Sequence, residues 1–415
     1  MKIYLVGGAV RDELLGLPSR ERDWVVIGAT PKLMLEQGYR RVGKDFPVFL
    51  HPDTNEEYAL ARTERKTGTG YHGFEFDTGS AVTLEQDLGR RDLTINAMAK
   101  SASGELIDPF GGSADLKRRL LRHVTDSFRE DPVRVLRVAR FAARFRSLGF
   151  RVHDETMALM RAIVADGEAG HLQPDRVWRE TARALTGQNP RVFFEVLREA
   201  GALALLFPEI DRLFGVPQPA RWHPEIDTGL HTMMVLEQSA FLSPDIAVRF
   251  AALTHDLGKG ETPADELPSH AGHEQKSVRL VADICNRLPI PNSCRDLALL
   301  VAELHGQAHR IAELKPATAM RLLEKTDALR RPGRFEQFVL ACEADSRGRT
   351  GLEDAPYPPA DILRTLAQAA ASVSSEKLSK KGFSGKKLGE EIRRQRLEAI
   401  ARVLRPPDES VSRGK

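Results

Sequence analysis

Cysteine is scarce in this sequence, and its scarcity narrows the class of protein. The 415 residues include only three cysteines, at positions 285, 294 and 342, and none of them forms a C-x-x-C pair. An odd count with no regular spacing argues against the disulfide framework that is typical of small secreted proteins. The sequence therefore predicts a protein of a reducing compartment, and we expect it to be cytoplasmic.

Long apolar runs are also missing. No stretch approaches the ~20 apolar residues that a bilayer span requires, and the apolar start of the chain is soon broken by Arg11 and Asp12, unlike the core of a signal peptide. The sequence contains no internal repeat and no low-complexity tract. We therefore expect no membrane partner. A content of 41% hydrophobic and 29% charged residues indicates a globular chain of two to four domains.

A large net charge is absent, but the basic residues are concentrated in two segments. The whole chain carries a formal charge of +3. Residues 117–151 contain eleven Lys and Arg against three acidic residues, and residues 376–405 contain ten against four. Such patches fit the phosphate backbone of a nucleic acid. The alternative, a solvated helix face, applies more readily to the second segment than to the first, whose arginines recur at regular spacing.

The pattern of apolar residues changes near residue 115. Before it, short runs indicate strands and turns of a small mixed α/β domain; after it, apolar residues recur at helical spacing. The expected strands are 2–6, 23–27, 46–50, 57–62 and 93–98, with a helix at 31–37; the expected later helices are 120–148, 154–164, 175–185, 191–200 and 250–259. Prolines at 208, 217, 219 and 224, and the segment 354–360, mark expected boundaries.

The first chemical motif is GGAVRD at residues 7–12, between an expected strand and an expected helix. Gly7 and Gly8 lack a Cβ, so the backbone there can adopt positive φ and approach a phosphate, while the amides of the following helix attract anions. Taken alone, such a motif is usually only a turn.

Two acidic residues follow at the start of an expected strand. Glu21 and Asp23 are two positions apart, so on a strand their side chains point the same way. Two carboxylates on one face can hold Mg²⁺, although an acid-x-acid pair at a strand start is more often a solvated edge. Together, the glycine turn and the two carboxylates predict a site for a nucleotide triphosphate and its metal ions.

Arginines dominate the next two motifs. Residues 90–98 read RRDLTINAM, and residues 130–141 read EDPVRVLRVARF. Pro132 suits the first turn of a helix with Asp131 at its cap. On that helix three arginines recur every three residues, at positions 134, 137 and 140. A carboxylate and a guanidinium near one end can hydrogen-bond the edge of a base, and the later arginines can take phosphates.

These motifs, in this order and with GSADL at 112–116, resemble those of the class II CCA-adding enzymes, the tRNA nucleotidyltransferases that build or repair the terminal CCA of tRNA. The resemblance covers residues 1 to about 220, and the remainder resembles a bacterial subgroup with an extra hydrolase domain. It implies an α+β fold: an N-terminal mixed α/β nucleotidyltransferase head of the polymerase-beta-like type, a mainly α-helical body, a helical HD domain and a helical tail. The implied bounds are 1–140 for the head, 141–222 for the helical body, 225–335 for the HD phosphohydrolase domain and 336–415 for the basic tail.

The resemblance also implies roles for individual residues. Glu21 and Asp23 would bind Mg²⁺ and be catalytic, and Asp131 and Arg134 would pair with the incoming C or A in place of a template. The residues implied to contact the nucleotide are Gly8, Arg11, Arg91, Arg137 and Arg140, and Asp12 and Asp92 would orient neighbouring arginines. The family has Asp where this chain has Glu21. The extra methylene moves the carboxylate by about 1.5 Å, and we expect Glu21 still to bind the metal.

A second set of polar residues follows the pattern of HD-type metal phosphohydrolases. The set is His231, His255, Asp256 and Asp345, in which His255 and Asp256 would be catalytic and all four would bind metal. Imidazoles with carboxylates suit a divalent transition metal such as Ni²⁺, whose bound water is a nucleophile at neutral pH. A lone histidine in an apolar run is more often a core residue, but four residues in this order favour a metal site. The order of these residues does not decide whether His273 and His305 also belong to the metal site. His223 is predicted as a turn residue at the boundary.

The reaction implied by the resemblance is attack of the tRNA 3′-hydroxyl on the α-phosphate of CTP or ATP, with departure of pyrophosphate and without a nucleic-acid template. The HD domain implies phosphatase, 2′-nucleotidase and 2′,3′-cyclic phosphodiesterase activities. Two alternatives stay open: a poly(A) polymerase with the same head, and a metal phosphohydrolase whose head only binds RNA. The HD pattern disfavours the first and the intact head motifs disfavour the second. The partners are then tRNA, CTP and ATP, and the chain is a monomer or a homodimer.

Overall fold

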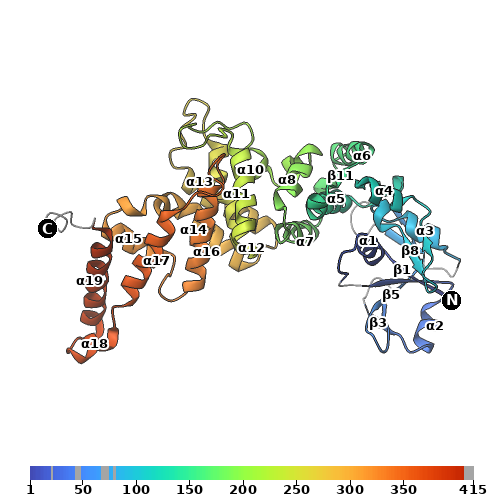
Figure 1. The fold of residues 1–415 in the computed structure, drawn as a ribbon, viewed down its shortest axis with the longest axis horizontal. Helices are drawn as coiled ribbons and strands as arrows, with labels where there is room; N and C mark the ends of the chain where they lie inside the picture. The colour runs from blue at the N-terminus through green and yellow to red at the C-terminus, as the bar shows by residue number, and fades with distance from the viewer. Residues whose placement is uncertain (20–21, 43–47, 67–73, 78–80, 406–415) are drawn as a thin grey trace, which may run out of the picture. The chain divides into compact units, whose positions relative to one another are not determined.

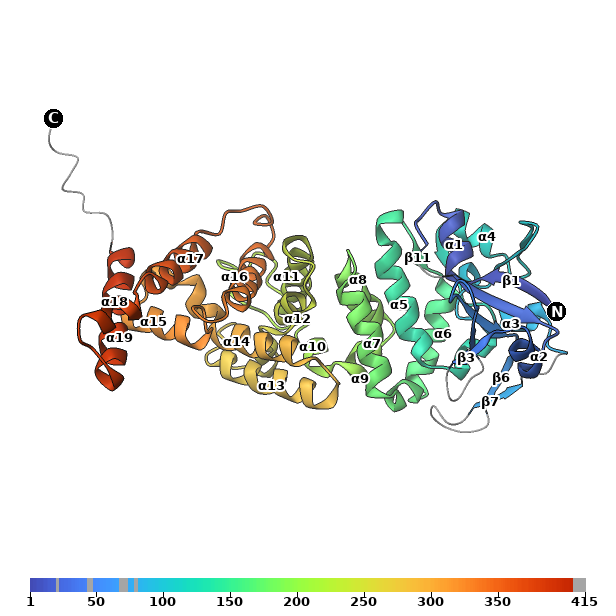
Figure 2. The ribbon, with the colours of Figure 1, turned by 90° about the horizontal axis from the view of Figure 1, so that it is seen from below.

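The computed structural model describes residues 1–19, 22–42, 48–66, 74–77 and 81–405, with the backbone alone at 64–66 and 74–77. The chain divides into two compact units (Figures 1 and 2). The first unit comprises residues 1–184 and 192–206, and the second comprises 185–191 and 207–415. Within the described residues, no helix combines the length and the apolar character that crossing a membrane requires.

The first unit contains a mixed sheet of seven strands. Apolar residues fill both faces: Val25 lies in one buried cluster with Leu88 of α3 (Leu84–Gly89), and its neighbour Val26 lies in the other with Met34 of α2 (Pro31–Glu36). The alternation of a strand therefore buries both sides of this sheet. The order of its strands is β3 (Arg40–Val42), β4 (Val48–Leu50), β5 (Glu57–Leu60), β2 (Asp23–Ile27), β1 (Lys2–Val6), β8 (Ala99–Ser101) and β9 (Leu106–Ile107).

Strand pairing brings two of the motifs to one end of the sheet. Strands β1 and β2 are antiparallel with Val6 opposite Asp23, and β5 runs parallel to β2 with Glu57 opposite Asp23. The glycine turn after Val6 and the carboxylate at the start of β2 therefore lie at the same end. The predicted strands 2–6 and 23–27 are confirmed with these bounds.

Helices and short strand pairs complete this part of the chain (Figure 1). The pairs are β6 (Thr63–Lys66) with β7 (Phe74–Asp77) and β10 (Leu120–Leu121) with β11 (Arg151–Val152). The helices are α1 (Gly8–Leu14), α2 (Pro31–Glu36), α3 (Leu84–Gly89), α4 (Gly112–Arg118), α5 (Val133–Phe145), α6 (Asp154–Ala165), α7 (Pro174–Leu185), α8 (Pro190–Glu199) and α9 (Ala202–Leu206).

Two sequence predictions in this region are wrong. Residues 93–98 form a 3-10 turn at Thr94–Asn96 instead of a strand, because Asp92 Oδ1 accepts hydrogen bonds from the Leu93 amide at 2.8 Å and from Asn96 Nδ2 at 2.9 Å. Local side-chain bonds of this kind compete with a sheet ladder. The single helix expected at 120–148 is divided into β10, a 3-10 turn and α5, since the rigid ring of Pro132 begins a new helix.

The second unit is helical. Helices α11 (Thr228–Leu242), α12 (Ile246–Thr254) and α16 (Pro332–Arg347) meet in a buried cluster formed by Val235, Ala252 and Ala344. The apolar run expected as a helix at 250–259 ends as α12 at Thr254, and a 3-10 turn covers Leu257–Glu261. The helices are α10 (Pro208–Asp211), α11 (Thr228–Leu242), α12 (Ile246–Thr254), α13 (His273–Arg287), α14 (Asn292–His309), α15 (Pro316–Lys325), α16 (Pro332–Arg347), α17 (Pro358–Ala371), α18 (Ser375–Lys380) and α19 (Gly385–Leu404).

Two glycines allow segments of the second unit to approach each other closely. A Cβ on Gly258 would lie 2.1 Å from the carbonyl oxygen of His273, and a Cβ on Gly348 would lie 2.4 Å from Val235 Cγ2. Only glycine avoids these clashes. The turn after His255 and Asp256 can therefore lie against the start of α13, and the end of α16 can lie against α11.

Candidate functional sites

The glycine turn of the first unit is shaped as the sequence predicts. Gly7 has a φ of +70°, and α1 begins at the next residue. A Cβ on Gly7 would lie 2.9 Å from Nη1 of Arg91, so a guanidinium lies directly against the turn. Asp23 is exposed at the start of β2, whereas Glu21 lies outside the described residues.

A chain of ion pairs connects the arginines near this turn. Arg11 is buried and donates to Asp12 Oδ1 at 2.8 Å and to Asn96 Oδ1 at 2.5 Å. Arg144 donates to the other oxygen of Asp12 at 2.8 Å. The predicted contact of Asp12 with a neighbouring arginine is therefore present.

The other predicted orienting carboxylate, Asp92, accepts from Arg137 Nε at 2.7 Å and from Asn96 Nδ2 at 2.9 Å. Burial by itself raises the pKa of this carboxyl group, but the charge of Arg137 and the hydrogen bonds from Asn96 and Arg137 outweigh it. The net result is a pKa of Asp92 well below its ordinary value. The carboxylate is thus ionised and holds Arg137 in place.

Helix α5 carries the other predicted nucleotide residues. Asp131, just before the helix, accepts from Arg176 Nη2 at 2.7 Å, and Arg140 donates to Glu180 at 2.5 Å. Arg134 is buried and donates to the backbone carbonyls of Ser127 and Arg90, each at 2.6 Å. The guanidinium of Arg134 is therefore fixed by main-chain atoms on two sides.

Sequence reasoning missed the partners on helix α7. Arg176 and Glu180 are four residues apart, so they lie on the same face of α7. Arg176 forms an ion pair with Asp131, just before α5. Glu180 forms one with Arg140, the last of the three periodic arginines. The only sequence signal was a pair of opposite charges at helical spacing, which by itself names no partner.

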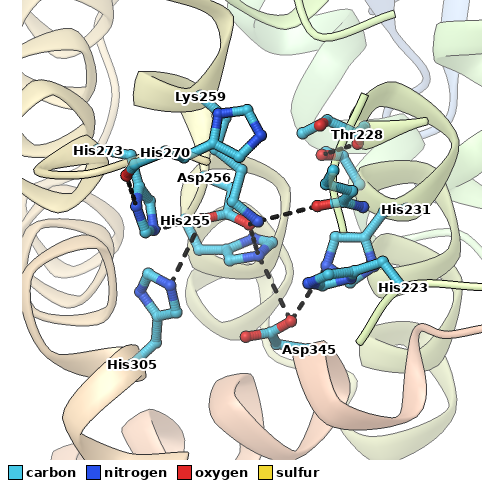
Figure 3. Close-up of polar contacts among 12 residues, drawn as sticks. His223, Thr228, His231, His255, Asp256, Lys259, His270, His273, His305 and Asp345 are labelled. Carbon is cyan, nitrogen blue, oxygen red and sulfur yellow. Dashed lines mark hydrogen bonds and ion pairs between the residues drawn. The ribbon is translucent and has the colours of Figure 1, made fainter. Parts of the chain in front are cut away.

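The second unit brings together all four residues predicted as metal ligands (Figure 3). His231 comes from α11, His255 and Asp256 follow α12, and Asp345 lies on α16. His231 Nε2 lies 3.1 Å from Asp345 Oδ1, and His255 Nε2 lies 3.0 Å from Asp256 Oδ2 and 3.6 Å from Asp345 Oδ1. His231, His255 and Asp345 thus form a buried triad whose ligand atoms lie within 4.8 Å of one another.

An adjoining triad includes the two histidines that the sequence left open. His273 Nε2 lies 3.2 Å and His305 Nε2 lies 3.4 Å from Asp256 Oδ1. Figure 3 shows both rings pointing toward Asp256 from the side opposite to His231. His273 and His305 therefore belong to the same polar cluster as the predicted ligands.

Backbone carbonyls orient the imidazole rings of the cluster. The Nδ1 atoms of four histidines lie 2.7 to 2.9 Å from carbonyl oxygens: His231 from Gly348, His255 from Ala252, His273 from His270, and His305 from Val301. A carbonyl only accepts, so each Nδ1 carries a hydrogen. In a neutral ring the lone pair is then on Nε2, the atom that faces the carboxylates.

Unsatisfied buried atoms show that the cluster fits a cation. Among the described residues, His255 Nε2, Asp256 Oδ1 and His273 Nε2 are buried without a hydrogen-bond partner. Each such atom costs about 1–3 kcal/mol of folding free energy when it stays unpaired. Imidazole nitrogens and carboxylate oxygens are the donors that divalent transition metals prefer. The donor set therefore suits a divalent transition-metal ion.

Several residues of the cluster have pKa values that differ strongly from their ordinary values. Burial raises the pKa of Asp256 and of Asp345, but the charge of His255, which both carboxylates share, and further basic partners hold each pKa well below its ordinary value. Burial lowers the pKa of His231, but hydrogen bonds to Asp345 and Glu225 raise it on balance. Ionised Asp345 thus lies beside His231, which must lose its Nε2 proton before that atom can bind a metal.

Sequence reasoning missed two charged residues of this site. Lys259 is buried, and its Nζ lies 2.7 Å from Asp256 Oδ2 and 3.0 Å from Gln218 Oε1. Glu225 Oε1 lies 3.0 Å from His231 Nδ1. A lysine three residues after Asp256 was a usable signal, because that spacing keeps it on one turn.

His223 is more than the boundary turn residue that the sequence predicts. Its amide donates to the Pro219 carbonyl at 3.1 Å, as a turn requires, but its ring lies with its centroid 4.6 Å from that of His231. His223 Nδ1 lies 3.1 Å from Glu225 Oε1, and burial lowers the pKa of His223 to about 4. The turn thus brings a further imidazole and a carboxylate to the edge of the cluster.

The fold and the two clusters define a class of protein, a nucleotidyltransferase head followed by an HD domain. Three family models match the chain: the poly A polymerase head domain at residues 3–122, the probable RNA and SrmB-binding site of polymerase A at 149–214, and the HD domain at 228–331. The predicted fold class is confirmed.

Whole-chain relatives identify the family. The multifunctional CCA protein of Thioalkalivibrio sulfidiphilus is 64% identical over 97% of this chain and 98% of its own length. That of Nitrosococcus oceani is 60% identical over 97% and 99%. The chain belongs to the multifunctional CCA protein family, which confirms the predicted resemblance.

Solved structures share the fold at lower identity. A CCA-adding enzyme in an apo form has a TM-score of 0.65 at 20% identity and covers 99% of this chain and 89% of its own. The Thermotoga maritima CCA-adding enzyme complexed with tRNA has a TM-score of 0.62 at 19% identity, with coverages of 97% and 90%. A complex of a CCA-adding enzyme with ATP has a TM-score of 0.63 at 19% identity and covers 98% of this chain and 88% of its own.

Proposed function

We propose that the first unit adds C, C and A in turn to the 3′ end of tRNA, using CTP and ATP. The identity of 60–64% to multifunctional CCA proteins over nearly the whole chain carries this conclusion. The arginine-lined helix α5 and the glycine turn supply the parts that the reaction needs. The tRNA 3′-hydroxyl attacks the α-phosphate, and pyrophosphate leaves.

The residues of the first unit have separable tasks in this reaction. Arg11, Arg91, Arg137 and Arg140 neutralise the phosphates, and Gly8 contributes backbone contact at the turn. Asp131 and Arg134 present hydrogen-bonding groups to the incoming base in place of a template strand. Because partners such as Asp12 and Asp92 already fix the arginines, little reorganisation is needed when the nucleotide binds.

Both units belong to domain families that use divalent metals. In the first unit, Asp23 with Glu21 would hold Mg²⁺, which supplies charge neutralisation at the reacting phosphates. We propose Mg²⁺ here because carboxylate oxygens are its preferred protein ligands. Glu21 keeps this role despite the longer side chain.

The second unit we propose to be a phosphohydrolase that acts on phosphomonoesters, 2′-nucleotides and 2′,3′-cyclic phosphates. His231, His255, Asp256 and Asp345 would hold a divalent transition metal, for which we propose Ni²⁺; the ion supplies Lewis acidity and activates a water. Lys259 provides the positive charge for a substrate phosphate beside Asp256.

We propose that the protein acts in the cytoplasm. The three cysteines are free thiols, and burial raises the pKa of Cys285 and of Cys294 to about 11, so both are protonated and unreactive at neutral pH. A reducing compartment suits such thiols.

The primary experiment offers a tRNA that lacks its last three nucleotides. With CTP alone we expect addition of two C residues, and with CTP and ATP we expect C-C-A and then a halt. The added ends are read by sequencing. Successive addition of A from ATP would instead identify a poly(A) polymerase. Lack of any addition alongside metal-dependent phosphatase activity would favour the phosphohydrolase with an RNA-binding head.

A matched experiment tests the second unit. Hydrolysis of 2′,3′-cyclic AMP and of p-nitrophenyl phosphate is measured after chelation and after return of Ni²⁺ or Mg²⁺. We expect Ni²⁺ to restore more activity than Mg²⁺, because the site offers imidazole nitrogens. Equal activity in the chelated and the reloaded protein would rule out a metal at this site.

A further inference from the structure

Two residues outside the predicted metal ligands, half-buried His309 and buried Tyr357, form a chain of contacts that ends at Asp345. His309, the last residue of α14, places Nε2 2.6 Å from Asp345 Oδ2. Tyr357, just before α17, places its hydroxyl 2.9 Å from His309 Nδ1. Both contacts bring residues from distant parts of the sequence to the back of one metal-site carboxylate.

His309 differs from the other histidines of the cluster in its Nδ1 partner. In His231, His255, His273 and His305 this atom lies beside a backbone carbonyl, which leaves the Nε2 lone pair for a metal. In His309 the partner is a hydroxyl, which can donate as well as accept.

One arrangement of hydrogens satisfies the whole chain of contacts. An ionised Asp345 only accepts, so His309 must donate its Nε2–H to Oδ2. Nδ1 of the neutral ring is then an acceptor, and the Tyr357 hydroxyl must donate to it. His309 therefore acts as a hydrogen-bond donor to the carboxylate. Because its Nε2 carries a hydrogen, this atom has no lone pair with which to bind a metal.

The two carboxylate oxygens of Asp345 have different partners. Oδ2 is occupied by His309, while Oδ1 faces His231 at 3.1 Å and His255 at 3.6 Å. Arg349 Nη2 lies 3.9 Å from Oδ1 and is too distant for a hydrogen bond. Among the described residues, His309 is thus the hydrogen-bonding partner of Oδ2, and His231 is that of Oδ1.

We propose that His309 and Tyr357 are positioning residues: Tyr357 orients His309, and His309 holds Asp345 so that Oδ1 alone is presented to the metal. The proposal rests on the proposed metal-binding role of Asp345. Loss of a hydrogen-bonding partner behind a metal ligand typically lowers metal affinity about 10–100-fold. The pair would therefore raise the affinity of the second unit for its divalent ion.

The test measures Ni²⁺ binding to the metal-free, full-length protein by isothermal titration calorimetry. We expect His309→Leu, which removes the donor, to weaken binding about 10–100-fold. His309→Gln keeps an amide donor near the position of Nε2 and should recover most of that loss. Tyr357→Phe should weaken binding by a smaller factor, since the ring of His309 remains but can change its tautomer.

The double variant separates positioning from independent packing effects. If Tyr357 acts through His309, then His309→Leu with Tyr357→Phe binds Ni²⁺ as weakly as His309→Leu alone. Additive losses would overturn the proposed coupling. Equal losses in His309→Gln and His309→Leu would also overturn it, because they would show that hydrogen-bond donation is not the function of the residue.

Internal controls distinguish failure of the inference from failure of the proposed function. The midpoint of urea unfolding in the same samples reports whether the second unit of each variant is folded, and His171→Leu, an exposed site in the first unit, serves as the matched histidine control. If the wild-type protein and Asp345→Asn both fail to bind Ni²⁺, the proposed metal site is wrong. If wild type binds, Asp345→Asn does not, and His309→Leu is unchanged, the positioning role alone is wrong.

Discussion

At the scale of single residues, the second unit holds some of the polar side chains of its site through partners far away in the sequence. His231 and Gly348 are 117 residues apart, and His309 and Tyr357 are 48 apart. Each contact fixes a ring or a carboxylate that would otherwise rotate freely. The function of such a residue therefore depends both on its chemical type and on the atom that orients it.

The titration of His223 gives a testable dependence of stability on pH. Its pKa is about 4 in the folded protein because of burial, against an ordinary value of about 6.5 in an unfolded chain. Between these values the unfolded state binds a proton and the folded state does not, so stability falls as the pH falls from 6.5 toward 4. The slope from this one group is at most about 1.4 kcal/mol per pH unit.

The measurement is urea unfolding of the metal-free protein at pH 7.5 and pH 5.5. We expect the midpoint of the wild type to fall more between these pH values than that of His223→Gln, with His171→Gln behaving as the wild type. Parallel shifts in wild type and His223→Gln would contradict the assignment of a depressed pKa to His223.

A glycine substitution tests how closely the site is packed. Gly258→Ala places a Cβ 2.1 Å from the His273 carbonyl, and overpacking of this kind typically costs about 1–3 kcal/mol. We expect a lower midpoint of urea unfolding and weaker Ni²⁺ binding. Gly333→Ala is the control, because a Cβ there meets no atom within 4 Å. Equal midpoints for the two variants would show that the turn relaxes without cost.

At the scale of elements, helix α7 determines how the residues of α5 are held. Arg176 and Glu180 lie one turn apart and contact Asp131 and Arg140, near opposite ends of the segment that carries the nucleotide residues. The two ion pairs therefore connect α7 to both ends of this segment. Residues that never touch the nucleotide can therefore influence its binding.

Removal of the acidic partner on α7 should impair nucleotide addition. Glu180→Gln leaves Arg140 without its charged partner, and a hydrogen bond to a charged group contributes about 1.5–3 kcal/mol. We expect KM for CTP and ATP to rise about tenfold or more, measured by steady-state addition to tRNA. Asp175→Asn, an exposed acid on the same helix, should have no effect. Equal KM values for the two variants would contradict the role of Glu180.

At the scale of the whole molecule, the two chemistries lie in separate compact units. The predicted nucleotide residues belong to the first unit, whereas the candidate metal-binding triads belong to the second. Each unit has its own buried core, formed around the sheet in one case and between α11, α12 and α16 in the other. This division suggests that the loss of one activity leaves the other intact.

Reciprocal substitutions check the division. Asp23→Asn should abolish CCA addition and leave hydrolysis of 2′,3′-cyclic AMP unchanged, because it removes a proposed Mg²⁺ ligand of the first unit only. Asp256→Asn should have the opposite effect. Both assays are run on the same samples of full-length protein. A variant that lost both activities while keeping the wild-type unfolding midpoint would show that the units are functionally coupled.

Local patterns made part of the fold and of the site predictable. Strands 2–6 and 23–27 could be identified because a short apolar run bounded by glycine or by charged residues is compatible with few other secondary structures. The segment 93–98 could not, since its buried apolar residues look the same in a strand and in a packed 3-10 turn. Only the hydrogen bonds of Asp92 distinguish the two.

The sequence by itself determined the ordered motifs, the family and the four candidate ligands of the HD cluster, because these depend on residue type and spacing. The tertiary structure decided which side chains meet. It brought His273 and His305 to Asp256, placed Lys259 beside the same carboxylate, and set His309 behind Asp345. The physical reason is that long-range contacts depend on how helices pack, and residues that lie together on packed helices leave no common spacing in the chain.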